Sequence, residues 1–249
     1  MSFQLYDFHG KEISFDDLDN KAFWCKHGED KEIAFVKIYK KLQESNLIDK
    51  KYSVEIHPEK TANPFHLDLE INGDEIGDAK IKNSPLFMAK VYKVDPQYAL
   101  TIDLKDIFNY RKKFIEDGQD IHIFIWVKWE AERMVTKYNT TSIKKMGGIW
   151  HTKISRVLNH LDENRNEISI HWYRDKFRKP TFYDPNDSWS QELLDFEPRL
   201  LIKGRVRNIS SKGFFIPTGQ NRTMPSGHSS GSYVLDLSKK SLFEEIYFW

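Results

Sequence analysis

The sequence predicts an α/β (α+β) fold in which helices flank a mixed central β-sheet. Helix-like and strand-like segments alternate through the first half of the chain. An Asn-Gly pair joins two of the strand-like segments into a hairpin, and the segment IHIFIWVKW (121–129) is apolar on both faces, as in a strand buried between two layers. Together these patterns are typical of a sheet covered by helices.

The first elements follow from the spacing of apolar residues. A helix is expected over about residues 31–45, because apolar side chains recur there at i, i+3, i+4 and i+7. The segment YSVEI (52–56) is rich in β-forming residues and predicts a strand. Residues 65–71 and 75–82 alternate apolar and polar side chains on either side of Asn72-Gly73, which is the pattern of a β-hairpin.

The later elements are marked by caps and breakers. Ser84-Pro85 supplies an N-cap and a first-turn proline for a helix that should end before Asp95-Pro96. The segment QYALTIDL (97–104) predicts a strand, and the helix after it should end at Gly118. One more amphipathic helix is expected in the second half, from the helical spacing of Trp150, Ile154, Val157, Leu158 and Leu161.

Composition indicates a globular protein of the cell interior. The 249 residues are 39% hydrophobic and 30% charged, with a mean hydropathy of −0.63. No apolar run approaches the roughly 20 residues that span a bilayer, and the N-terminal segment lacks the basic and apolar regions of an export signal. A cytoplasmic location is therefore expected. The single Cys25 excludes an internal disulfide and a zinc site built on several cysteines.

The charge is distributed unevenly between the two halves of the chain. Residues 1–129 hold 19 Lys and Arg against 23 Asp and Glu, whereas residues 130–249 hold 19 against 14. An acidic half beside a basic half suits a metal-binding core next to a region that grips nucleic acid. We therefore expect a catalytic core over residues 1–130 and a DNA-recognition region over residues 131–249, either separate or packed into one domain with the core.

The register of the predicted hairpin determines which side chains share a face. With Asn72, Gly73 and Asp74 as a three-residue loop, Asp68 lies directly opposite Asp78. One face is then apolar and contains Leu67, Leu69, Ile71, Ala79 and Ile81. The other face contains His66, Asp68, Glu70, Asp78 and Lys80.

The opposed Asp68 and Asp78 predict a magnesium site. Two carboxylates directly across a ladder repel each other unless a cation lies between them, and Mg²⁺ prefers carboxylate oxygens and water. Glu70 and Glu55 are further candidate ligands, and Lys80 is placed to orient a water or to stabilise negative charge on a phosphate. The same pattern also suits an ordinary solvated hairpin face, so this alternative stays open.

These residues resemble the core of the PD-(D/E)xK nucleases, the superfamily that includes type II restriction endonucleases. Asp68 stands for the first acid, after Leu67 instead of proline, and Asp78-Ala79-Lys80 stands for the D-x-K element. The order of predicted elements over residues 31–129 is similar to that family's core. The resemblance implies Asp68, Asp78 and Lys80 as catalytic residues, Mg²⁺ as the cofactor, and a restriction-endonuclease-like core.

The second half offers candidate DNA contacts. Lys203, Arg205 and Arg207 are spaced by two and so share one face of an extended strand, which suits a row of phosphate contacts. Lys82 extends the Lys80 face. The remaining candidates are Arg174, Lys176, Arg178 and Lys179 in one basic segment, and Arg222 in a polar loop. Each of these also fits an ordinary protein surface.

The sequence contains no motif for nucleotide binding or for a zinc protease of the HExxH type. GxxxxGK[ST], GxGxxG and HExxH are all absent. We therefore expect a magnesium-dependent endonuclease acting on double-stranded DNA, most simply a type II restriction enzyme of a restriction-modification system. Cutting both strands of a symmetric site favours a homodimer. A repair or junction nuclease of the same fold and a non-catalytic DNA-binding protein are the alternatives.

Overall fold

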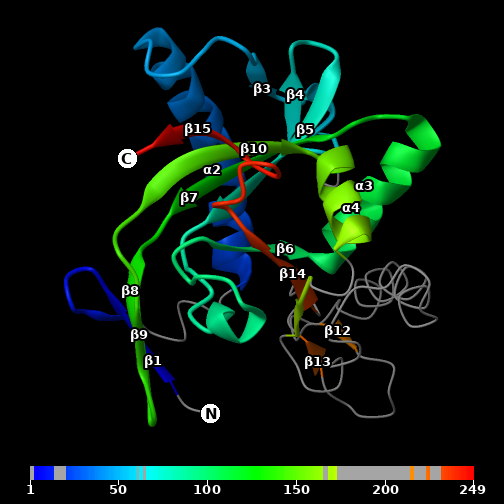
Figure 1. The fold of residues 1–249 in the computed structure, drawn as a ribbon. Coiled ribbons are helices and arrows are strands. Elements are labelled where there is room, and N and C mark those ends of the chain that lie inside the picture. The colour runs from blue at the N-terminus through cyan, green and yellow to red at the C-terminus, as the bar shows by residue number, and fades with distance from the viewer. Residues whose placement is uncertain are drawn as a thin grey trace. The chain divides into compact units, whose positions relative to one another are not determined.

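The computed structural model describes residues 3–13, 21–60, 62–63, 66–164, 168–172, 214–215, 223–224 and 231–249. Within these residues the chain is α+β, with three α-helices and several sheets (Figure 1). No helix in this part of the chain combines the length and the apolar character that crossing a membrane requires.

The central sheet has six strands and is mixed, as predicted. Their order is β15-β10-β7-β5-β4-β3. Strand β5 pairs with β7 in parallel, and the other pairs are antiparallel. The bounds are β3 Val54–Ile56, β4 Leu69–Ile71, β5 Glu75–Lys82, β7 His122–Lys128, β10 Gly147–Lys153 and β15 Glu244–Phe248. Because β10 and β15 come from the second half of the sequence, this sheet extends beyond the core boundary expected at residue 130.

Three smaller sheets complete the strand inventory of the described residues. The first has the order β2-β1-β8-β9, the second β11-β14-β6, and the third joins β12 to β13. Their bounds are β1 Phe3–Asp7, β2 Glu12–Ile13, β6 Ala99–Asp103, β8 Ala131–Thr136, β9 Thr140–Ser142, β11 Ile170–Trp172, β12 Phe214–Phe215, β13 Thr223–Met224 and β14 Gly231–Asp236.

The chain divides into two compact units. The first consists of Met1–Leu100, Tyr110–Asn159 and Asp236–Trp249. The second consists of Thr101–Asn109 and His160–Leu235. The whole six-stranded sheet, and with it the predicted hairpin, belongs to the first unit.

Helix α2 (Lys21–Glu44) covers one face of the central sheet and packs on β3 and β5 (Figure 1). It contains the predicted helix and begins ten residues earlier. Its apolar stripe buries Phe35 and Tyr39 against Phe124 of β7, with ring centroids 5.8 and 5.6 Å from that ring. Leu69, Ile71 and Ala79 of the hairpin lie in the same buried cluster. This packing fixes which face of the hairpin is the core face.

The hairpin register is the predicted one. Leu69 pairs with Gly77 and Ile71 with Glu75 across the β4–β5 ladder, so three residues form the turn. Asn72 and Gly73 have positive φ values of 54° and 88°, which asparagine and glycine tolerate better than other residues. The turn residues therefore set the ladder that carries the acidic side chains.

Two further elements agree with the sequence. Strand β6 lies within the strand predicted at 97–104, and helix α3 (Leu104–Asp117) ends at Gly118, whose φ is 66°. Strand β7 is buried on both faces along most of its length. These elements have strong local signals at both ends.

The predicted helix after Ser84-Pro85 is wrong. The chain forms only a 3-10 turn there, η2 (Ala89–Tyr92), which closes at Lys93 with a φ of 59°. On a helix, Phe87 and Val91 would share one face. Phe87 is instead 5% exposed, whereas Val91 is 70% exposed. The tertiary packing of this segment therefore overrides the local preference for a helix that Ser84-Pro85 indicates.

The helix predicted in the second half begins later than expected. Helix α4 spans Ile154–Glu163, whereas Trp150 lies in β10. Strand β10 is paired on both sides, with β7 and with β15, so ladder hydrogen bonds hold Trp150 in an extended conformation. Its helical spacing from Ile154 is coincidental.

Two buried histidines face each other inside the first unit. Nδ1 of His122 and Nε2 of His151 are 2.9 Å apart, and both side chains are almost fully buried. Nδ1 of His151 lies 3.4 Å from the Tyr52 hydroxyl and 3.6 Å from Glu244, and Nε2 of His122 lies 3.2 Å from Glu75. Burial, reinforced by His122, lowers the pKa of His151 to about 3.

This pKa predicts a loss of stability in mild acid. In the unfolded chain the His151 imidazole takes up a proton near pH 6.5, whereas in the fold it stays neutral. Its contribution to the free energy of unfolding is therefore present above pH 6.5 and should fall by about 2 kcal/mol between pH 7 and pH 5. Urea unfolding of wild type and His151→Phe at both pH values measures this. The variant should lose distinctly less stability over that range, and equal losses would contradict the assignment.

Candidate functional site

The predicted acid pair is buried. Asp68 directly precedes β4 and Asp78 lies within β5, and each is only 5% exposed. The pairing of Leu69 with Gly77 places the two acids at the next position of the ladder. The backbone N–H of Ala79 donates to Oδ2 of Asp68 at 3.3 Å, which ties the two strands together at this point. Such burial does not suit an ordinary solvated hairpin face.

Asp78 is held by two donors on the same oxygen. The Tyr110 hydroxyl, from helix α3, donates to Oδ2 of Asp78 at 2.5 Å. Nζ of Lys80 lies 2.6 Å from the same oxygen, and the Lys80 side chain is 19% exposed. The ammonium group also lies 5.5 Å from the centre of the Tyr110 ring. Tyr110 therefore contacts both members of the predicted D-x-K element.

Asp68 is held by a lysine from outside the hairpin. Nζ of Lys60, at the end of the 3-10 turn η1 (Pro58–Lys60), forms an ion pair with Oδ1 of Asp68. The same ammonium group lies 3.9 Å from Oε2 of Glu32 on helix α2. The Lys60 and Glu32 side chains are both largely buried. The turn η1 and helix α2, which both lie outside the hairpin, thus bring Lys60 and Glu32 to its first acid.

The cluster has an excess of negative charge when all its groups are ionised. We name Glu32, Lys60, Asp68, Asp78 and Lys80 the acid–lysine cluster; it contains three carboxylates and two ammonium groups. The pKa of Asp78 is raised to about 6, chiefly by burial and further by the adjacent Asp68 carboxylate, against the opposing effect of Lys80. Burial lowers the pKa of Lys60, but its carboxylate neighbours outweigh that effect and raise it overall.

This arrangement fits a hard divalent cation. Two neighbouring carboxyl groups that are largely buried favour a proton or a cation between them. The pKa of Asp78, raised first by burial and then by Asp68, agrees with this preference. The donors are oxygen atoms, which Mg²⁺ prefers. Tyr110 and Lys80 both approach Oδ2 of Asp78, so neither of these two contacts involves its Oδ1.

The other predicted ligands lie differently. Glu55 is half-exposed and forms an ion pair with Lys40 of helix α2, whose Nζ lies 2.5 Å from Oε1 and 2.6 Å from Oε2 of Glu55. Glu70 lies opposite Glu55 on one side and opposite Ile76 on the other, two pairs nearer the turn than the acid pair. Neither is part of the acid–lysine cluster.

The predicted DNA contacts are mostly outside the described residues. Lys82 is described and lies half-buried at the end of β5, opposite Val127. The remaining positions, which the structure does not describe, are Arg174, Lys176, Arg178, Lys179, Lys203, Arg205, Arg207 and Arg222.

Three members of the site were missed by the sequence analysis. Glu32 lies three residues before Phe35 and therefore falls on the apolar stripe of α2. An acidic residue at such a position could have been recognised in the sequence as a candidate site residue. Tyr110 was counted as an apolar residue of α3, although a buried tyrosine needs a partner for its hydroxyl. Lys60 lies in an irregular loop whose sequence has no periodic pattern, so no signal placed it.

Comparisons of the chain with protein-family models, with curated proteins and with solved structures gave no match. The acid–lysine cluster is therefore interpreted from its own geometry.

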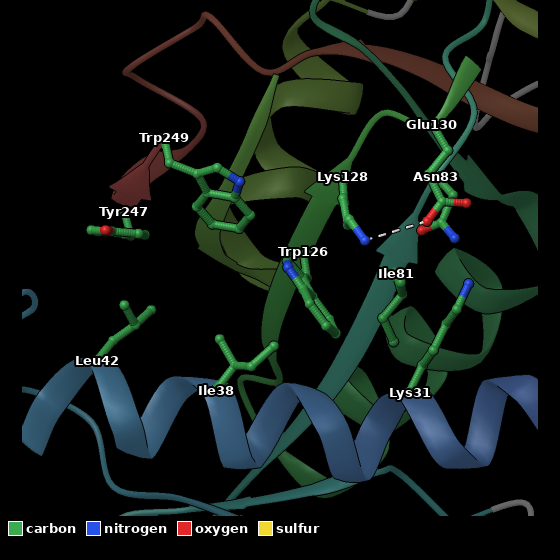
Figure 2. Close-up of a pocket in the computed structure, with 10 residues that line it drawn as sticks. All are labelled: Lys31, Ile38, Leu42, Ile81, Asn83, Trp126, Lys128, Glu130, Tyr247 and Trp249. Carbon is green, nitrogen blue, oxygen red and sulfur yellow. Dashed lines mark ion pairs between the residues drawn. The ribbon is translucent and has the colours of Figure 1, made fainter. Parts of the chain in front are cut away.

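A separate cavity of about 530 Å³ lies beside helix α2 (Figure 2). Three aromatic side chains form part of its wall, Trp126 from β7 and Tyr247 and Trp249 from the last residues of the chain. Ile81 lines the cavity, whereas Lys80 points to the opposite face of β5. The other lining residues are Lys31, Ile38, Leu42, Asn83, Lys128 and Glu130. The cavity is therefore distinct from the acid–lysine cluster.

The raised pKa of Asp78 predicts that this residue destabilises the metal-free fold. Its pKa is about 6 in the fold against 3.8 for the unperturbed group, so the folded state binds more protons between these values. The contribution of Asp78 to the free energy of unfolding is then largest below about pH 4 and is lost as the pH rises through 6. Replacing it with Asn, which still accepts from Tyr110 but cannot ionise, should stabilise the protein at pH 7.5 by about 1–3 kcal/mol.

The measurement is urea unfolding of wild type and Asp78→Asn in EDTA at pH 7.5 and pH 4. The difference in free energy should be largely lost at pH 4, where the wild-type carboxyl is protonated in the fold and is close to its own pKa in the unfolded chain. A variant that is less stable than wild type at pH 7.5 would show that the ionised carboxylate is net stabilising.

Proposed function

We propose that the chain is a magnesium-dependent endonuclease that hydrolyses phosphodiester bonds of double-stranded DNA, built on a restriction-endonuclease-like core. One observation carries this proposal: Asp68 and Asp78 are buried together at one position of a β-ladder, with Lys80 on the same face. The mixed sheet and the packing of helix α2 against it support the same proposal.

The residues have separate roles in this proposal. Asp68 and Asp78 would hold Mg²⁺, which when bound supplies Lewis-acid polarisation of a phosphate oxygen and a lower pKa for water. Tyr110 positions Asp78 through its hydrogen bond to Oδ2. Lys80, partly exposed beside the acid pair, is placed to stabilise the negative charge that develops on the phosphate, or to orient the attacking water.

Lys60 has a different role. In the present arrangement its ammonium group neutralises Oδ1 of Asp68. A cation at the acid pair would take over part of that neutralisation and weaken the hold of Asp68 on Lys60. Lys60 would then be available to a phosphate oxygen of the substrate. In the absence of a metal ion, Lys60 thus supplies the positive charge that neutralises Asp68.

Site-specific cleavage by a homodimer is the form of this activity that we favour, as in type II restriction enzymes. A repair or junction nuclease of the same fold would use the same residues. A non-catalytic DNA-binding protein is the second candidate, and the observation that favours it is that Lys60 and Lys80 already pair with both acids. Discrete fragments from a sequenced phage genome separate the first two possibilities, and an absence of cutting in Mg²⁺ supports the third.

Removal of either central residue should separate metal binding from chemistry. Asp78→Ala should reduce plasmid cleavage at least about hundredfold, because it removes a cation ligand. Lys80→Ala should reduce it by a similar factor yet leave magnesium affinity nearly unchanged, because an ammonium group does not bind the ion. Gel assays of cleavage and calorimetry with Mg²⁺ measure both effects.

The matched control is Glu55→Ala, which removes a half-exposed acid of the neighbouring strand and should leave cleavage intact. Near-wild-type cutting by Asp78→Ala would refute the assignment of the site. A collapse of magnesium affinity in Lys80→Ala would refute the role given to that lysine.

The basic row Lys203, Arg205 and Arg207 should control affinity for DNA. If these side chains contact phosphates, each Ala variant should make the slope of log affinity against log salt shallower by about 1 and weaken binding on all sequences alike. A residue that binds a guanine instead should cost roughly 1–3 kcal/mol on the preferred site only. Binding to specific and random duplexes with Ca²⁺ in place of Mg²⁺ measures this. An unchanged slope for all three variants would place the DNA elsewhere.

A further inference from the structure

A second group of metal-ligating side chains lies on the loop that carries Lys60. His57 follows β3, Glu59 lies in the turn η1, and His66 lies two residues before Asp68. One donor atom from each of the three comes within 4.8 Å of the others. The two imidazole rings are 4.0 Å apart between centroids, with planes inclined by 31°. We name these three residues the histidine cluster.

The hydrogen bonding of His66 points to a cation in this cluster. Its Nδ1 lies 3.0 Å from the carbonyl oxygen of Leu67, which can only accept, so Nδ1 carries a proton and donates. In a neutral imidazole the other nitrogen, Nε2, then has a lone pair. That lone pair faces Oε2 of Glu59 at 3.2 Å. Two acceptors at this distance need a proton or a metal ion between them.

The hydrogen bond from His66 Nδ1 to the Leu67 carbonyl oxygen is of a kind that is common in metal sites. Ligating histidines usually donate their second ring N–H to a carbonyl or carboxylate, which fixes the ring and the tautomer. A tetrahedral zinc ion with bonds of 2.0–2.1 Å separates its donor atoms by about 3.4 Å. The separation between His66 and Glu59 is already close to that value. His57 receives only a 3.2 Å contact from the backbone N–H of Glu59 at Nδ1, which a ligand bond would replace.

The backbone supports this loop at both ends. The N–H of His57 donates to the carbonyl oxygen of Asp68 at 2.9 Å, and the N–H of His66 donates to Asn63 at 2.9 Å. The N–H of Lys60 donates to the carbonyl oxygen of His57 at 3.0 Å. His57 and His66 are thus held in place by backbone hydrogen bonds, and Glu59 is the exposed member of the three.

We propose that His57, Glu59 and His66 form a site for a borderline-soft divalent ion such as Zn²⁺, separate from the magnesium-type site at Asp68 and Asp78. Two imidazoles and one carboxylate suit Zn²⁺, Co²⁺ or Ni²⁺, whereas Mg²⁺ prefers oxygen donors alone. Three protein ligands leave one position for water. The ion braces the loop between β3 and β4, which presents Lys60 to Asp68. This site is independent of the proposed nuclease activity.

Cobalt is the probe, because tetrahedral Co²⁺ with imidazole ligands absorbs visible light strongly and an octahedral ion in an oxygen site does so weakly. Titration of the full chain with Co²⁺, without DNA, should give one equivalent of a tetrahedral spectrum that Zn²⁺ displaces and millimolar Mg²⁺ does not. Saturating Zn²⁺, at about a hundred times Kd, should also raise Tm by about 5–10 °C.

Four variants locate the ion. Affinity for Co²⁺ should fall by more than about tenfold in His66→Gln and in Glu59→Gln, since even the loss of an outer-shell partner has an effect of that size. It should stay unchanged in His9→Gln, which removes an exposed histidine outside the cluster, and in Asp78→Asn. Glu59 is 70% exposed, so its replacement tests the site without disturbing the fold.

Absence of the tetrahedral spectrum in wild type would overturn the proposal. Retention of full affinity in both His66→Gln and Glu59→Gln, or its loss in Asp78→Asn, would place the ion elsewhere and overturn the proposal as well. None of these readouts depends on cleavage, so failure of the nuclease assignment leaves this test intact.

Discussion

The repulsion between two buried carboxylates organises this site. Asp68 and Asp78 share one position of a ladder and are each only 5% exposed. At an effective dielectric constant of 20, two like charges at a separation of about 4 Å repel by roughly 4 kcal/mol. Lys60, Lys80 and Tyr110 each approach one of the two carboxylates and reduce that cost. The pKa of Asp78 is nevertheless raised to about 6, chiefly by burial and further by the Asp68 carboxylate, against the opposing effect of Lys80.

The core determines that the acids meet. A shift of one residue in the β4–β5 register would exchange the two faces of the hairpin, and Leu69 and Ile71 would leave the cluster packed against helix α2. Gly77 contributes to this close fit, because an added Cβ would lie 3.1 Å from Ile71 and 3.2 Å from the carbonyl oxygen of His122. Burial of the apolar face of the hairpin therefore stabilises the register that keeps Asp68 opposite Asp78.

The sequence predicted what local patterns determine and missed what tertiary contacts determine. Asn72-Gly73 and the alternation around it were sufficient for the hairpin register and hence for the meeting of Asp68 with Asp78. Ser84-Pro85 has the sequence of a helix start, but the ten residues between Pro85 and Pro96 pack alternate side chains and form only one 3-10 turn. Lys60 could not have been predicted, because only the folded loop places it beside Asp68.

Under the proposed function, the charge of the cluster would decide whether it can bind a phosphate. With Glu32, Asp68 and Asp78 ionised and both lysines protonated, the acid–lysine cluster has a net charge of −1. A divalent cation would reverse that charge, and one phosphodiester would then neutralise it. Without the cation, a phosphate would meet a negative site and be repelled. A lysine-to-metal exchange at Asp68 would therefore couple affinity for the phosphate to the presence of the ion, with both ammonium groups already in place to receive the substrate.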